Sequence, residues 1–325
     1  MLELYLNGTK YEFPNQWEEL TQEQFIYLSD LLWKYQQGLI SAGEVRIQYF
    51  LHVAGLKPRR IRRAEREQLF SENVYRACTH INFFFKWKYQ NEKAFAGFPA
   101  ELQKELLRTD PDDMETTQDV RVARKMKRHM EIDAAFARNL VPSLPGNRRI
   151  NAYRFVLEEN FLDTSMTAAQ YVDAYSVFET WSRDGKPEAM DLLVATLYQD
   201  KNYSSEMAHR NKDLVKRYPE DIKRAIVLNY MAIHVFLSQR TKYAILFSGT
   251  GSDKSGKITL GFHDSIYSLI KAGYGDVEQM NLVKFLELML KELIDNVNTL
   301  KANDMKLEDI ASKLKMTVSQ VKLLT

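Results

Sequence analysis

The chain has one cysteine among 325 residues, too few for a disulfide framework or a cysteine-based metal site. That residue, Cys78, lies in an apolar stretch. We therefore interpret it as a small buried core residue rather than a reactive thiol, in a protein of a reducing compartment.

The chain also lacks a net charge of one sign and a long hydrophobic run. Its 45 Lys and Arg nearly balance 43 Asp and Glu, leaving +2, so no global field draws it to nucleic acid or anionic lipid. The longest apolar run, 226–237, is interrupted by Asn229 and His234 and is shorter than the roughly 20 residues that a bilayer requires. Residues 1–10 lack the regions of a signal peptide, so we expect a cytoplasmic protein.

Hydrophobic residues make up 45% of the chain, which is enough for a full core and about two domains. Apolar residues recur mainly at helical spacing, so the predicted fold class is mainly α, a helical bundle. Capping residues and the Gly and Pro positions place the helices at 22–37, 44–54, 71–87, 116–138, 168–183, 187–198, 219–241 and 281–302. The spacings of Thr21 with Gln24 and of Thr317 with Gln320 predict capping boxes.

Two short hairpins are expected beside the helices. Alternating residues around Asn7-Gly8 predict a small N-terminal β-hairpin, because that dipeptide suits a tight turn. A second short hairpin is predicted near 243–260, with strands at 243–247 and 257–260. The acidic stretch 110–119 predicts a linker between an N-terminal domain, 1–109, of the hairpin and helices, and a helical domain, 120–325. The helical domain is expected to end in a helical hairpin.

No complete set of catalytic or metal-binding residues is found. Gly251 to Lys257 matches part of a phosphate-binding loop, but Ile258 stands where the Mg²⁺-binding Ser or Thr belongs, which favours a plain turn. The six histidines are scattered, and His80 and His234 lie in apolar helical contexts. We expect a protein that is not an enzyme and has no catalytic residues, metal ligands or cofactor, although tertiary neighbours can still assemble a site.

Two segments are candidates for nucleic-acid binding. The basic run 57–66 includes Arg59, Arg60, Arg62 and Arg63, which can neutralise phosphates, but it lacks aromatic residues for stacking on bases. A patch for an acidic protein partner, or a solvated connection, is the favoured interpretation. Residues 307–314 and 317–324 resemble a helix-turn-helix in which Ser319, Gln320 and Lys322 would face bases, whereas a docked helical hairpin needs the same spacing.

The predicted helix 281–302 carries one continuous apolar stripe. It serves either as a docked core helix or as a surface for a partner helix. Its members are Leu282, Phe285, Leu286, Met289, Leu293, Val297 and Leu300.

The N-terminal pattern resembles a known group of proteins. The hairpin around Asn7-Gly8, then Phe13-Pro14, Trp17-Glu18-Glu19-Leu20-Thr21 and the helix with Phe25-Ile26-Tyr27-Leu28, is similar to the openings of phage and prophage tail proteins. These are tail assembly chaperones, or neighbouring tail proteins, of bacteriophages of gut bacteria. The resemblance covers about the first 55 residues.

The resemblance implies a non-catalytic protein that binds other phage tail proteins, such as tail-tube or tape-measure polypeptides, and prevents their premature association. It would act in the cytoplasm of the bacterial host or stay associated with the virion. No functional residues carry over from it. A nucleic-acid-binding or regulatory protein that uses the basic run and the C-terminal hairpin is the alternative.

Overall fold

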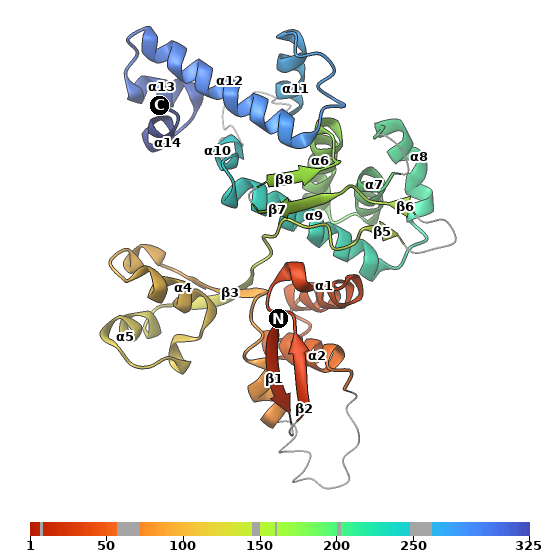
Figure 1. Ribbon diagram of the computed structural model, residues 1–325, viewed down its shortest axis with the longest axis vertical. Coiled ribbons are helices and arrows are strands. Elements are labelled where there is room, and N and C mark those ends of the chain that lie inside the picture. Colours follow the sequence, from red (N-terminus) through yellow and green to blue (C-terminus); the bar gives the residue numbers. More distant parts are fainter. Residues whose placement is uncertain (7–8, 57–71, 145–149, 160, 200–202, 248–261) are drawn as a thin grey trace. The chain divides into compact units, whose positions relative to one another are not determined.

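The computed structural model is mainly helical with small antiparallel hairpins, which confirms the predicted fold class (Figure 1). It describes residues 1–6, 9–56, 72–144, 150–159, 161–199, 203–247 and 262–325. The chain divides into two compact units, unit 1 (Met1–Ala134) and unit 2 (Ala135–Thr325). Among the described helices, none has both the length and the apolar content needed to cross a membrane.

Unit 1 opens with the expected N-terminal hairpin. Strands β1 (Leu2–Leu6) and β2 (Thr9–Phe13) pair antiparallel, and the predicted turn residues Asn7 and Gly8 lie outside the described residues. Phe13 is fully buried and stacks on Phe50 with ring centroids 4.7 Å apart. An isolated hairpin is marginal in water, and this contact helps to hold it to the helices.

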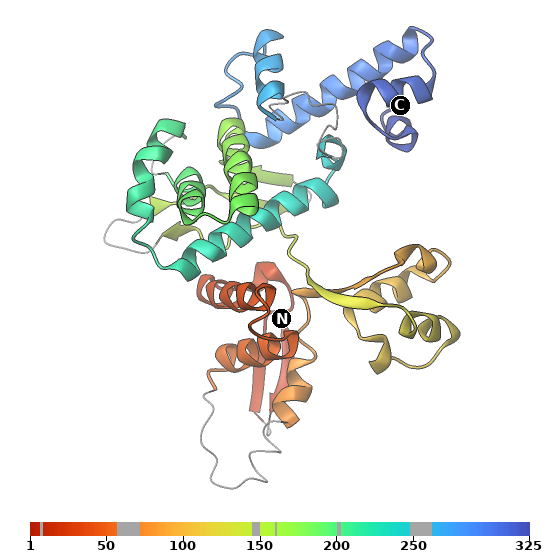
Figure 2. The same ribbon diagram turned by 180° about the vertical axis from the view of Figure 1, so that it is seen from behind.

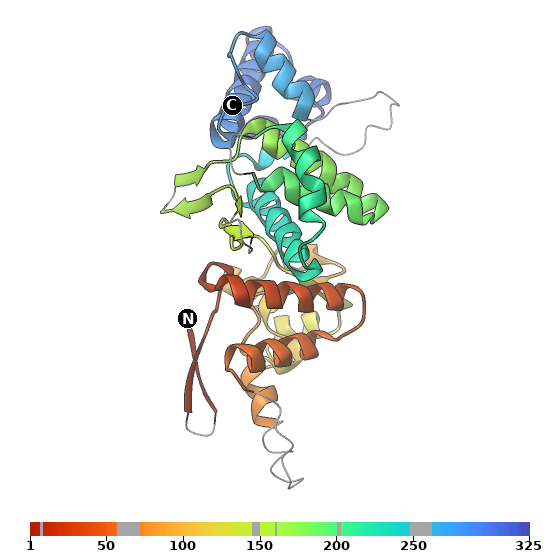
Figure 3. The same cartoon turned by 90° about the vertical axis from the view of Figure 1, so that its right-hand side faces the viewer.

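The first two helices have capping boxes at their N-termini. The short helix η1 (Trp17–Glu19) precedes α1 (Gln22–Gln36), and α2 (Ala42–Val53) packs beside α1 (Figure 3). The Thr21 hydroxyl accepts from the Gln24 backbone N–H at 3.2 Å, and Gln24 returns the bond at 3.1 Å. This reciprocal pairing, which the sequence predicts, satisfies free donors of the first turn.

The predicted helix 71–87 is shorter than expected. Helix ends at residue 78, and the next element is strand β3 (Phe85–Tyr89), paired antiparallel with β4 (Arg128–Ile132). Three aromatic residues alternate with two lysines along β3, which is a strand period hidden within an aromatic-rich segment. The predicted helix 116–138 is also too long, because α5 (Gln118–Arg124) ends before strand β4 begins.

The remaining elements of unit 1 pack against the β3–β4 ribbon. They are η2 (Glu92–Phe95), α4 (Ala100–Arg108), η3 (Pro111–Asp113) and α5. Their own small core is built from Tyr89, Phe95, Leu106 and Ala123.

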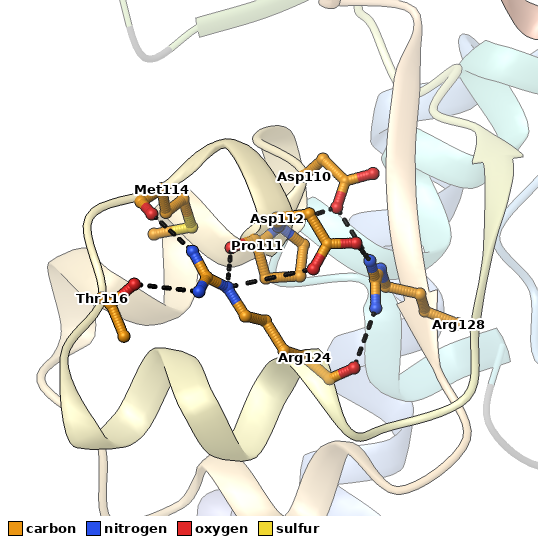
Figure 4. A network of polar contacts seen from close by, with 7 residues as sticks. All are labelled: Asp110, Pro111, Asp112, Met114, Thr116, Arg124 and Arg128. Atoms are coloured by element: carbon orange, nitrogen blue, oxygen red, sulfur yellow. Dashed lines mark hydrogen bonds and ion pairs between the residues drawn. The ribbon is translucent and has the colours of Figure 1, made fainter.

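The segment 110–119, predicted as an acidic linker, lies inside unit 1, and the units divide instead at Ala134 and Ala135. Arginine side chains fix this segment (Figure 4). Arg124 donates to the backbone oxygens of Pro111 and Met114, each at 2.7 Å, and Arg128 contacts Asp110 at 2.8 Å and Asp112 at 2.6 Å. The acidic residues are therefore counter-ions within a folded element, which composition alone cannot distinguish from a solvated linker.

Unit 2 is built on helices, with two small hairpins. The hairpins are β5 (Ser143–Leu144) with β6 (Ile150–Asn151), and β7 (Phe155–Glu158) with β8 (Phe161–Thr164). The helices of its body are α6 (Ala168–Asp184), α7 (Pro187–Leu197), α8 (Ser205–Val215) and α9 (Glu220–Arg240). Asn229, which interrupts the apolar run of α9, is buried, and its amide bonds the backbone of Arg138 at 3.1 Å and Leu140 at 2.6 Å.

The first strand of the second hairpin expected near 243–260 is not formed. Residues 244–247 are the short helix α10 (Ala244–Phe247), and 257–260 lie outside the described residues. The Thr241 hydroxyl accepts from the backbone N–H of Tyr243 at 3.1 Å, and the backbone N–H of Leu246 donates to the carbonyl oxygen of Tyr243 at 2.8 Å. These local bonds favour a helical turn over an extended strand.

The C-terminal part of unit 2 contains α11 (Phe262–Lys271), the long α12 (Leu282–Ala302), α13 (Leu307–Leu314) and α14 (Val318–Leu323) (Figure 2). The expected terminal helical hairpin is therefore present. Thr317 and Gln320 form the predicted capping box at the start of α14.

A buried ion pair in unit 2 gives the first prediction. Lys223 on α9 is 2% exposed, and its ammonium lies 2.8 Å from a carboxylate oxygen of buried Asp191. We expect Asp191→Ala to lower the free energy of unfolding by roughly 3 kcal/mol, because it leaves a buried charge without its main partner. The apolar pair Asp191→Leu with Lys223→Met should recover most of this loss in urea unfolding.

The control for this prediction is Glu220→Gln. The Glu220 carboxylate lies 3.0 Å from the same ammonium but is half exposed, so its loss should change the stability by at most about 1 kcal/mol. An Asp191→Ala protein as stable as the wild type would contradict the importance of the pair.

The half-buried His234 gives the second prediction. Its Nδ1 forms a hydrogen bond with the Tyr171 hydroxyl at 2.8 Å, and its ring stacks on Tyr175. Burial lowers the pKa of His234 to about 4. Because the unfolded chain binds this proton below about pH 6.5 and the folded chain only below about pH 4, stability should fall as the pH decreases between these values. We expect a loss on the order of 2 kcal/mol by urea unfolding, given partial exposure of the ring.

His234→Gln, which keeps a polar group but does not titrate, should remove this part of the pH dependence. An unchanged slope between pH 6.5 and pH 4 would show that other groups cause it.

Candidate functional site

Of the basic site residues predicted from the sequence, the structure describes only Lys322. Arg59, Arg60, Arg62 and Arg63 fall within 57–71, outside the described residues, and so does the loop Gly251 to Lys257 within 248–261. Lys322 is exposed on α14.

Cys78 and the histidines lie in ordinary structural settings. Cys78 is buried, and burial raises the pKa of its thiol to about 11, which confirms the core interpretation. His80, expected in an apolar helix, is instead exposed in a turn. Within the described part of the chain, no group of three or more His, Cys, Asp and Glu residues could hold a metal ion.

One grouping in unit 2 has the residue types of a hydrolase triad. Ser176 lies 3.4 Å and Asp173 3.7 Å from His263, but both approach the same ring nitrogen, Nε2. The Ser176 hydroxyl also donates to the backbone oxygen of Val172 at 3.1 Å. A triad needs the serine and the carboxylate on opposite nitrogens, so this arrangement does not activate Ser176 as a nucleophile.

A groove in unit 2 runs along α12 and is here called the α12 groove. It has a volume of about 400 Å³ and is lined mainly by apolar side chains. The lining includes Ile245 and Leu246 of α10, Leu269 of α11, Met289 and Leu293 of α12, and Leu314 and Met316 at the end of α13.

The first turn of α12 is fixed to the body of unit 2. Leu282 donates its N–H to the backbone oxygen of Met166 at 2.9 Å, and the Asn281 amide donates to the backbone oxygen of Thr164. Leu282, Phe285 and Leu286 are fully buried. At the first turns of α12, the apolar stripe is therefore part of the core of unit 2.

The last turns of α12 are fixed differently, by the terminal hairpin. Val297 of α12 is buried in a cluster with Ile310 and Ala311 of α13 and Val321 of α14. Faces of α12, α13 and α14 thus enclose a second small core, which is separate from the core around the first turn of α12.

Between these two anchors, the helix has no fully buried residue. The residues from 287 to 296 include five apolar side chains that are only half-buried, namely Leu288, Met289, Leu290, Leu293 and Ile294. Met289, Glu292, Leu293 and Asn296 share one face at helical spacing, and all four line the groove. Tyr267 and Ile270 of α11 are 61% and 40% exposed.

The charged residues that line the groove are both acidic, Asp264 and Glu292. The Tyr274 hydroxyl donates to Glu292 at 2.6 Å, and this bond raises the pKa of that tyrosine. The groove therefore combines an apolar floor with a negative edge.

Searches against protein-family models, curated proteins and solved structures find no match to this chain. The α12 groove is accordingly assigned from its geometry. The groove residues Met289 and Leu293 belong to the same apolar stripe as Leu282 and Val297. Their spacing in the sequence does not distinguish the half-buried middle of the stripe from its buried ends.

The terminal hairpin is the second candidate surface. Lys315 adopts a left-handed conformation, φ 55°, in the turn between α13 and α14. On α14, Ser319 and Lys322 are exposed, whereas the side-chain oxygen of Gln320 accepts from the Thr317 backbone N–H at 2.7 Å. Capping thus occupies one of the three side chains proposed to face bases.

Proposed function

We propose that this protein is a non-catalytic interaction protein of phage tail assembly, and that the α12 groove binds an amphipathic helix of another tail protein. The observation that carries the proposal is the middle of α12, where apolar residues that the described part of the chain leaves half-buried line a groove. Amphipathic helices bind such grooves through apolar side chains at i, i+3, i+4 and i+7.

The charge at the groove indicates the chemistry of the partner. The Glu292 carboxylate at the groove favours a helix whose apolar face is flanked by Lys or Arg. A groove of about 400 Å³ accommodates a few anchoring side chains, not a whole domain. The expected ligand is therefore a short basic amphipathic segment.

The opening of the chain supports the tail-protein part of the proposal. The hairpin β1–β2, the buried Trp17 and the capped helix α1 form the motif on which the resemblance depends. Tail-tube and tape-measure polypeptides expose apolar surfaces before they assemble. Binding of such a segment in the α12 groove would delay the association of the tail polypeptide, as a chaperone does. This would occur in the host cytoplasm or on the assembling virion.

Co-expression with the tail proteins encoded beside this gene tests the proposal. The wild type should co-purify with one of them. The variant Met289→Ser/Leu293→Ser should lower the affinity at least tenfold, because it removes apolar contacts from the floor of the groove. Affinities are measured by calorimetry with the purified partner, and circular dichroism verifies the fold.

Lys291→Ser/Asn298→Ser is the matched control. Both residues are exposed on the opposite side of α12, so this variant should bind as the wild type does. Equal binding by the two double variants would exclude the groove, and the absence of any complex would contradict the assembly role. Self-association that only the groove variant loses would identify a second copy as the occupant.

A nucleic-acid-binding or regulatory role is the second candidate, and the α13–α14 hairpin favours it. Two short helices joined by a tight turn, the second of them with a capping box, pack on the end of α12, which is the arrangement of a three-helix DNA-binding unit. The six-residue α14 offers Ser319 and Lys322 as exposed polar groups.

A gel-shift salt series tests this second role. Binding to duplex DNA should weaken steeply with salt and should fall in Lys322→Ala, and in the quadruple variant Arg59→Ala/Arg60→Ala/Arg62→Ala/Arg63→Ala. Exposed Lys284, at the other end of α12, provides the control Lys284→Ala. Undetectable binding at low salt would exclude the role.

A further inference from the structure

Unit 1 contains an open cleft of about 800 Å³, which is independent of the α12 groove. The first turns of α2, the end of helix 72–78 and the residues around η3 line it. Three arginines, Arg46, Arg76 and Arg108, contribute to its walls, together with the rings of Tyr75 and Trp87. Its size suits a small organic ligand.

Two charged groups of the cleft already have strong partners. The Arg108 guanidinium donates to the backbone oxygens of Phe83 at 3.1 Å and Phe85 at 3.0 Å, and to the Asp133 carboxylate at 2.5 Å. Asp110 accepts from Arg128 at 2.8 Å. Their charges are therefore compensated within the protein.

Arg46 is different. Its Nε atom is buried without a hydrogen-bond acceptor among the described residues, and Nη2 meets only the Met130 sulfur, at 3.8 Å. The guanidinium lies over the Phe85 ring at 5.7 Å. Burial lowers the pKa of this arginine. In the described part of unit 1, no carboxylate lies within ion-pair distance of it.

This arrangement is costly unless an anion completes it. A thioether is a weak acceptor, and the buried Nε–H has lost water without gaining a partner among the described residues. The Nε of Arg128 is also buried without an acceptor among the described residues, but its Nη2 is paired with the carboxylates of Asp110 and Asp112, a partner that Arg46 does not have. An arginine held by an aromatic ring and facing an open cleft has the fork that binds carboxylate or phosphate with two parallel hydrogen bonds.

We infer that this cleft binds a small ligand through an oxyanion, a carboxylate or a phosphate, which is the counter-ion of Arg46. Arg76, exposed at the cleft, adds a second positive charge. Tyr75 and Trp87 offer ring surfaces for an apolar or planar portion of the ligand.

Thermal unfolding of the full chain in sodium phosphate, sodium benzoate and sodium chloride at equal ionic strength and pH tests the inference. Phosphate or benzoate should raise the midpoint saturably by about 3 °C over chloride. The active probe distinguishes a phosphate-bearing from a carboxylate-bearing ligand. Arg46→Met should remove the increase, while Arg121→Met, which changes an exposed arginine of α5, should keep it.

Arg46→Lys provides a second variant that retains the charge but loses the fork, and it should weaken the anion effect about tenfold. The arginine Nε–H resonance in ¹⁵N spectra that disappears in Arg46→Met should also shift when the active anion is added to the wild type. No midpoint change with either anion would overturn the inference. An equal change in Arg46→Met would also overturn it, because that result indicates a general salt effect.

Discussion

The C-terminal half of this protein depends on how one helix is divided between two cores. Helix α12 has 21 residues and is about 31 Å long, whereas each of its anchors covers only one end. Phe285 and Leu286 are buried with the body, and Val297 is buried with the terminal hairpin. The length of the helix therefore leaves a central apolar segment that neither core covers.

An apolar surface that is held rigidly but left partly uncovered is suited to binding. The hydrogen bonds at Asn281 and Leu282 fix one end of the helix, and the Val297 cluster fixes the other. A partner segment thus meets a preformed groove and does not have to order it, which reduces the entropic cost of association. The same scaffold can present both the α12 groove and the α13–α14 hairpin.

Unit 1 shows the same contrast between completed and incomplete interactions, here among arginines. Arg124 and Arg128 turn the acidic segment after α4 into a folded element by bonding its backbone and carboxylates. Arg108 is likewise satisfied by Asp133 and two backbone oxygens. The Arg46 guanidinium lies over an aromatic ring, and its buried Nε has no acceptor among the described residues. Charge count alone would treat these four residues as equivalent.

The sequence by itself determined the helical class, the N-terminal hairpin strands, the capping boxes at Thr21 and Thr317, and the extents of α6, α7, α9 and α12 within a few residues. These features arise from contacts between residues near in the chain. Only the tertiary structure decided that β3 pairs with β4 and that 110–119 is folded. It also decided that, among the described residues, the middle of α12 is only half-buried and the Nε of Arg46 has no acceptor. Each of these depends on residues distant in sequence, whose presence or absence local spacing does not encode.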